Sequence, residues 1–165
     1  MSYSIIGGAD GPTSIFVAGQ IGIGWFNGYG LIFLILLLIP NIVYALKCKD
    51  AVNKCTDKWA LVMEQIGRYG SMFFMVFTFG SLIQGWASVT EFMVYLLGST
   101  LLMVAYWIVW MLYFAEVSMW KSMALAIIPT LLFLFGGITM RNIPAIALAV
   151  VFGIGHIDVT YKNQE

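Results

Sequence analysis

The sequence predicts an all-α membrane protein, a polytopic bundle of five transmembrane helices preceded by an N-terminal broken or re-entrant helix. Three observations predict this fold. Hydrophobic residues make up 61% of the 165 residues and charged residues 10%, so a core of this size cannot bury the apolar surface and lipid is the expected solvent. Five apolar runs approach the length of a membrane-spanning helix. Most of the basic residues lie on one side of the predicted bundle.

Residues 1–27 form the first predicted part, an N-terminal arm with the broken helix. It contains the stretch SIIGGADGPTS, in which Asp10 is the only charged residue of the first 46. Its glycines permit backbone angles that other residues avoid, and Pro12 fits the first turn of a following helix. Two placements stay open: a helix over 12–26 that is too short to span alone, or a sixth span over 4–26.

Residues 28–165 are predicted to form the helical bundle. Its five spans are Gly28–Leu46, about Ile66–Trp86, Phe92–Phe114, Ser122–Ile138 and Ile143–Ile157. The turns that follow the second, third and fourth spans are short, so neighbouring helices are expected to run antiparallel.

The pair Pro40-Asn41 interrupts the first span. The proline removes a helix hydrogen bond and leaves a carbonyl without its donor, which Asn41 could satisfy or share. A simple kink and a polar spot that lines a cavity are the two interpretations.

Residues 48–65 are predicted to form a cytoplasmic amphipathic segment before the second span. Apolar residues recur there at steps of three and four, at Val52, Cys55, Trp59, Val62 and Ile66. This stripe predicts a helix on the inner leaflet that continues into the second span. A helix that packs on its own bundle is the alternative.

The fifth span carries a smooth ridge of small residues, Ala145, Ala149 and Gly153, which step by four. Small residues at this spacing let helix backbones approach closely. Internal packing is the favoured interpretation, and a dimer interface is the alternative.

The distribution of Lys and Arg indicates which end of the predicted bundle faces the cytoplasm. Seven basic residues fall on one side of the predicted bundle, and Arg141 alone falls on the other. The lysine-rich side is therefore expected to be cytoplasmic, together with the C-terminus. The predicted location is the bacterial cytoplasmic membrane.

Ionisable and polar residues near the spans are the other site candidates, since such groups in membrane segments are often functional. They are Asn41, Glu64, Arg68, Glu116, Arg141 and His156. Glu64 and Arg68 form an i,i+4 pair in the favourable order near the inner interface. None lies clearly in mid-span, so the charged candidates are interpreted as interfacial anchors or end-caps.

Several function classes lack support in the sequence. The net charge of zero offers no basic patch for nucleic acid. A single histidine is too little for a transition-metal site, and no nucleophile triad, Walker A loop or dinucleotide fingerprint is present. No catalytic residue and no organic cofactor is predicted, and the chain is not expected to be an enzyme by itself.

The opening stretch has two chemical interpretations. One is an ordinary turn before an apolar helix. The other is a discontinuous helix in which the carbonyls of Gly7, Gly8 and Ala9 join the Asp10 carboxylate around a sodium ion, because unwound backbone supplies hard oxygen ligands.

The stretch SIIGGADGPTSIFVA closely resembles the signature of the β subunit of sodium-translocating decarboxylases, which act on oxaloacetate, methylmalonyl-CoA or glutaconyl-CoA. The likeness covers about residues 4–18. In that family the GGADGPT stretch lies in a broken helix, and its Asp takes part in sodium and proton translocation. The resemblance therefore implies that Asp10 is the ion-linked acid. It also implies that Gly7, Gly8, Gly11, Pro12 and Thr13 shape the break.

The remainder is similar to a group of small, uncharacterised multi-pass membrane proteins from Firmicutes. The segments LIPNIVYALKCKD, MEQIGRYGSMF and GHIDVTYKN carry this likeness, which covers roughly residues 30–163. It implies the bundle fold and no particular activity.

Together these features predict a small integral membrane protein that binds sodium through its arm and serves as a transport-related or accessory subunit. Its partners would be the lipid bilayer and either further copies of the chain or another membrane subunit. The alternative is a non-transporting membrane module, of the immunity or envelope-stress type, that acts by binding a partner.

Overall fold

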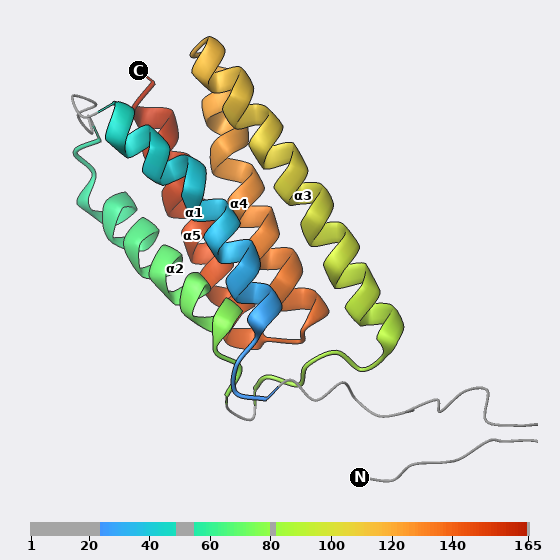
Figure 1. The fold of residues 1–165 in the computed structure, drawn as a ribbon. Coiled ribbons are helices and arrows are strands. Elements are labelled where there is room, and N and C mark those ends of the chain that lie inside the picture. Colours follow the sequence, from blue (N-terminus) through green and yellow to red (C-terminus); the bar gives the residue numbers. More distant parts are fainter. Residues whose placement is uncertain (1–23, 49–54, 80–81, 165) are drawn as a thin grey trace, which may run out of the picture.

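The computed structural model describes residues 24–48, 55–79 and 82–164. Within these ranges the chain forms five helices that lie alongside one another (Figure 1). They are α1 (Gly28–Lys47), α2 (Lys58–Val76), α3 (Val89–Ala115), α4 (Met119–Thr139) and α5 (Ile143–Lys162). The described residues contain isolated β-bridges but no strand. The predicted all-helical class is confirmed for this part of the chain, whereas the N-terminal arm up to residue 23 lies outside it.

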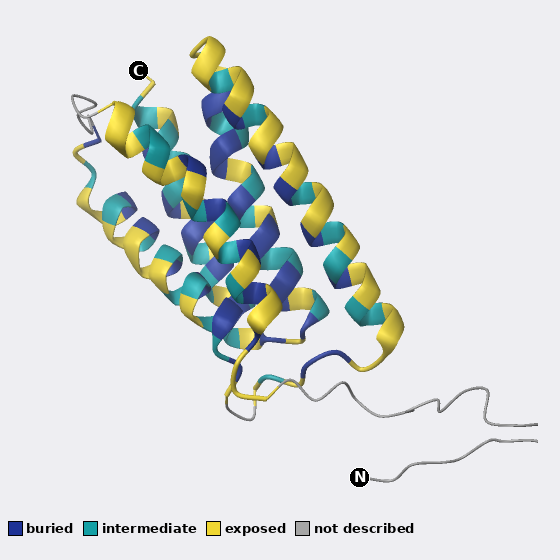
Figure 2. Ribbon diagram, in the orientation of Figure 1, coloured by how far each residue is buried: buried dark blue, intermediate teal, exposed yellow. Residues whose placement is uncertain are grey.

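Four helices are long and apolar enough to cross a membrane: α1, α3, α4 and α5. Large apolar side chains are exposed on all four helices, and the yellow segments mark the exposed residues along α3 (Figure 2). On α3, Leu97 and Leu101 are 67% and 71% exposed. Outward apolar faces of this kind fit a multi-pass membrane protein, because lipid is the solvent that favours them.

The predicted second span is wrong in its bounds. The prediction ran from about Ile66 to Trp86, but α2 begins at Lys58 and ends at Val76. It begins there because Asp57 caps it: Asp57 Oδ1 accepts from the backbone N–H of Trp59 at 3.0 Å. With Glu64 and Arg68 inside it, α2 is not among the helices that meet the length and composition of a span.

The amphipathic segment 48–65, which the structure describes at residue 48 and over 55–65, is also corrected. From Lys58 onward this sequence is α2 itself, packed into the bundle. The apolar stripe of Trp59, Val62 and Ile66 is exposed, while the buried face of α2 is made largely of small and polar residues. The alternative interpretation, a helix that packs on its own bundle, is the one the structure shows.

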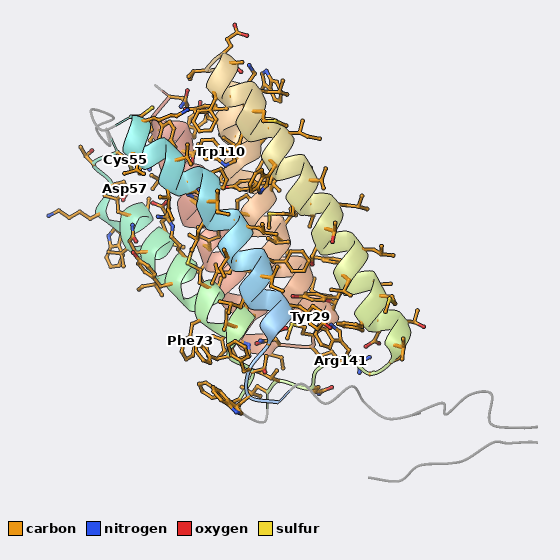
Figure 3. All side chains as sticks on the ribbon, viewed as in Figure 1. Tyr29, Cys55, Asp57, Phe73, Trp110 and Arg141 are labelled. Atoms are coloured by element: carbon orange, nitrogen blue, oxygen red, sulfur yellow. The ribbon has the colours of Figure 1, made fainter. Side chains whose placement is uncertain are left out.

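The two ends of the bundle differ in charge. Lys47, Lys58, Lys121 and Lys162 lie at or next to helix termini at one end, here called the lysine end. Arg141 lies in the turn between α4 and α5 at the opposite end, here called the arginine end (Figure 3). The charge asymmetry predicted from the sequence is therefore present, and the cytoplasmic side of the lysine end stays a prediction.

At the arginine end, two buried asparagines donate hydrogen bonds to the last carbonyls of α2. The last four carbonyls of any helix have no partner within it. Here the backbone N–H of Phe77 donates to the Phe73 carbonyl. Asn27 donates to the last two carbonyls, from Nδ2 to Met75 at 3.1 Å and from its backbone N–H to Val76 at 2.7 Å. Asn142 Nδ2 donates to the Phe74 carbonyl at 2.8 Å. All four carbonyls are thus paired, which lets the helix end inside an apolar environment.

The small-residue ridge of α5 packs inside the bundle. Ala145 and Ala149 are 4% and 0% exposed, and Gly153 is buried. A Cβ atom on Gly153 would lie 2.6 Å from Thr130 Cγ2 of α4. The favoured interpretation of this ridge, internal packing, is confirmed.

Candidate functional site

Three of the predicted polar candidates come together between α2 and α5. His156 Nδ1 lies 2.8 Å from Glu64 Oε1, and Arg68 pairs with the same oxygen. The Glu64 side chain is 6% exposed and that of His156 is 21% exposed. Their interpretation as interfacial anchors therefore needs correction for Glu64 and His156, because both lie between two packed helices.

The contact depends on a close approach of the two helix backbones. A Cβ on Gly155 would lie 2.4 Å from the backbone nitrogen of Glu64, and a Cβ on Gly67 would lie 2.3 Å from that of Phe152. Only glycine fits at such positions. The carboxylate is thereby brought directly against α5, about 9 Å along the helix from the lysine end at 1.5 Å per residue.

The charges define the hydrogen-bonding roles. An ionised carboxylate only accepts hydrogen bonds, and the Arg68 guanidinium donates to the same Glu64 oxygen. Nδ1 of His156 is therefore the donor to Glu64. No described residue is hydrogen-bonded to the other ring nitrogen, Nε2, which is left to accept or release a proton.

His156 also lines a cavity of about 240 Å³ at the lysine end of the bundle. Side chains of α1, α3, α4 and α5 and the residues after α5 enclose it. The lining residues are Asn41, Tyr44, Trp110, Tyr113, Ser122, Leu125, Ala126, His156, Thr160, Asn163 and Gln164. Most of these carry a polar group, although apolar atoms form the larger part of the wall, so the cavity can hold water beside His156.

Asn41 lines this cavity, as the sharper of its two interpretations predicted. Its Nδ2 donates to the Tyr106 hydroxyl at 2.7 Å and to the Leu37 carbonyl at 2.8 Å. It does not satisfy the carbonyl that Pro40 frees, which belongs to Leu36. Trp107 Nε1 donates to that carbonyl at 3.2 Å, so the predicted role of Asn41 is corrected there.

Apolar side chains cover the pair on the arginine side. The Phe152 ring stacks on His156 with centroids 4.7 Å apart, and Phe133 packs against Phe152 at 5.6 Å. Phe152 is 3% exposed, and Ala149, one turn further along α5, is fully buried. The pair therefore has a polar cavity on one side and a tightly packed apolar layer on the other.

The remaining candidates lie elsewhere. Glu116 is at the lysine end, where its carboxylate is 3.6 Å from Lys121 Nζ. Arg141 pairs with Glu91 at 2.5 Å at the arginine end. Glu116, Arg141 and His156 therefore do not share a pocket. The predicted ion-binding residues Gly7, Gly8, Ala9, Asp10 and Thr13 lie outside the described residues.

An ion-pair clamp joins the start of α2 to the end of α5. Lys162 Nζ lies 2.8 Å from Asp57 Oδ2 and 2.6 Å from Asp158 Oδ2. The hydrogen bond from Lys162, with those from the backbone of Ala60 and Trp59, lowers the pKa of Asp57 below its ordinary value of 3.8. Cys55 and Asp57 lie together at this end (Figure 3).

The lowered pKa of Asp57 predicts a loss of stability in acid. A carboxyl group with a depressed pKa in the folded state stabilises the fold above its unfolded pKa and loses that effect as pH falls through the folded value. We expect Asp57→Asn, which retains a capping side chain, to be less stable than the unmodified protein at neutral pH. The difference should close below about pH 4. Thermal unfolding in detergent across this range measures it, and a difference that persists in acid would contradict the role of the ion pair.

Sequence reasoning missed several residues that shape the site. Phe152, Tyr106 and Trp107 looked like ordinary apolar positions of spans. One signal could have found the burial of Glu64: Ala60, Glu64, Gly67 and Ser71 recur at helical spacing opposite the apolar stripe of α2. In lipid, such a small and polar face is the one that packs.

No group of three or more His, Cys, Asp or Glu residues that could hold a metal ion occurs among the described residues. Comparison with protein-family models, curated proteins and solved structures gives no match for this chain.

Proposed function

We propose that this chain is a small bacterial cytoplasmic-membrane protein that binds sodium through its GGADGPT stretch and acts as a transport-related or accessory subunit. The observation that carries the proposal is the single carboxylate, Asp10, within a glycine-rich and proline-broken stretch. A carboxylate together with freed backbone carbonyls is the donor set that sodium prefers in discontinuous helices.

The described structure supports the proposal in two ways. The described end of the arm is fixed to the bundle: the Trp25 carbonyl accepts from Thr78 N–H at 3.0 Å, and Asn27 is 2% exposed. An event in the arm would therefore act on the junction of α1 and α2. The bundle also holds a buried carboxylate, Glu64, and buried ionisable groups in membrane helices are characteristic of ion-linked proteins.

Sodium-dependent stability tests the proposal. We expect sodium chloride, compared with choline chloride at equal ionic strength, to raise the unfolding temperature of the full-length protein in detergent, because a ligand that binds the folded state stabilises it. Asp10→Asn should abolish the increase, whereas the matched change Asp158→Asn should retain it.

The result can also favour the alternative. If sodium has no effect, or the same effect on all three proteins, the sodium site is excluded. Purification with one stoichiometric partner and no ion flux in liposomes would then identify a partner-binding module. The α5 ridge is not the surface for such a partner, because it packs inside the bundle.

A further inference from the structure

We infer that Glu64 and His156 form a proton-binding site that exchanges protons with the lysine end of the bundle and not with the arginine end. The site is separate from the proposed sodium site, since none of its residues belongs to the arm. The inference is carried by three structural observations: the pair itself, the cavity on one side of it, and the apolar layer on the other.

The proton acceptor is His156 Nε2. Its partner nitrogen Nδ1 lies 2.8 Å from the Glu64 carboxylate, which fixes the orientation and the tautomer of the neutral ring. Binding adds one proton to the Nε2 lone pair and gives an imidazolium, with both ring nitrogens then acting as donors. The carboxylate faces the resulting positive charge, so no further reactant is needed.

The charged and titratable neighbours are few. Arg68 shares the Glu64 carboxylate on α2, and Tyr106 on α3 receives the Asn41 hydrogen bond. Tyr44 from α1 and Tyr113 from α3 line the cavity, and α4 contributes no titratable side chain to its lining. His156 is thus the imidazole of this cluster, and its Nε2 is the atom that can take up a proton.

The cavity supplies the path from the lysine end. A volume of about 240 Å³ holds several waters at roughly 30 Å³ each. Its wall includes Trp110, whose Nε1 is buried without a hydrogen-bond partner among the described residues. Such a group calls for a water partner. Asn163 and Gln164, which follow α5, place the mouth of the cavity at the lysine end.

The apolar layer blocks the opposite direction. Beyond His156, the contact between α2 and α5 is filled by Phe152 and Ala149 on one helix and by Gly67 and Ser71 on the other, and the buried Ser71 Oγ, which has no hydrogen-bond partner among the described residues, is the polar side-chain atom in this layer. Gly67 and Phe152 are in backbone contact, which leaves no room for a water chain. Proton transfer needs such a chain, so we infer that protons do not pass along this contact.

The single histidine makes the inference directly testable. Full-length protein labelled with ¹⁵N-histidine is reconstituted into vesicles, and one orientation is selected with an affinity tag at the C-terminus. The pH is then stepped on one side at a time, from about 8 to about 5, a range that brackets histidine titration. We expect the imidazole signals to change when the lysine-end side is acidified and to stay constant when the other side is. A response from the arginine end, from both sides, or from neither would overturn the inference.

Four variants separate this site from a merely structural contact. Phe152→Ala should open the apolar layer, so that the imidazole responds from both sides, whereas Phe33→Ala, an equally drastic loss of a buried ring elsewhere, should leave the response one-sided. Glu64→Gln should remove the Nδ1 signature of a hydrogen bond to a carboxylate. Asp10→Asn should change none of these results, so a failed sodium site and a failed proton site are distinguishable. Unchanged imidazole signals in Glu64→Gln would contradict the pair.

Discussion

Replacement of Asn142 by alanine is expected to lower the free energy of unfolding by about 2–4 kcal/mol. The side chain, which is fully buried, makes two bonds: Oδ1 accepts from Ala145 N–H at 3.0 Å as the N-cap of α5, and Nδ2 donates to the Phe74 carbonyl at 2.8 Å. Loss of an N-cap costs about 1 kcal/mol. A buried carbonyl left without a donor costs about 1–3 kcal/mol more.

Two matched variants divide this effect. Asn142→Ser retains a cap acceptor and removes the donor to Phe74 without placing a charge in the buried site. Ser88→Ala removes an exposed cap, in which Ser88 Oγ accepts from Glu91 N–H at 3.2 Å, and should cost only about 1 kcal/mol. Reversible unfolding of the three variants in mixed detergent micelles measures the differences. If Asn142→Ala costs no more than Ser88→Ala, the carbonyl of Phe74 has another partner, and the account given for the end of α2 is wrong.

The role of Asn142 explains why the end of α2 could not be predicted from local sequence. After Val76 the chain reads FTFGSLIQGW, which is apolar enough to continue a span. The helix ends because distant residues bind its last carbonyls: Asn142 comes from the turn before α5, and Asn27 from the start of α1. The starts of α1, α3, α4 and α5 were easier to predict, because a polar residue stands just before the apolar run of each helix.

The candidate site was predicted only in part for a similar reason. The pair of Glu64 and Arg68 follows from their spacing along one helix. The approach of His156 does not, because it depends on two contacts between helices, Gly155 against Glu64 and Gly67 against Phe152, each of which joins residues more than 80 positions apart in sequence. Glycines in apolar runs are too common in membrane helices to identify such a contact by themselves.

Replacement of Gly155 by alanine is therefore the second large effect, an expected loss of about 3 kcal/mol. The new Cβ would lie 2.4 Å from Glu64 N and 2.9 Å from the Ala60 carbonyl oxygen. These are backbone atoms, which cannot rotate away as the tip of a side chain can, so α2 and α5 must separate. The most extensive interhelical contact in the described structure would be weakened along its length.

Gly136→Ala is the matched control. Gly136 is also a buried helical glycine, but a Cβ there would meet Tyr95 Cε2 at 3.6 Å, an ordinary contact. Because alanine is the better helix former, this change should be neutral or stabilise the protein by up to about 1 kcal/mol. Unfolding in mixed micelles compares the two, and equal stabilities would show that α2 and α5 are further apart than described.

The same substitution connects packing to the site. Separation of α2 and α5 moves the Glu64 carboxylate away from His156, because both side chains project from backbones that Gly155 holds in contact. Gly155→Ala should therefore remove the carboxylate hydrogen-bond signature of the imidazole, as Glu64→Gln does, while every charged group is retained. Gly136→Ala should preserve the signature. A variant that loses stability but retains the signature would show that the pair holds together without the glycine contact, and that the two helices can adjust around it.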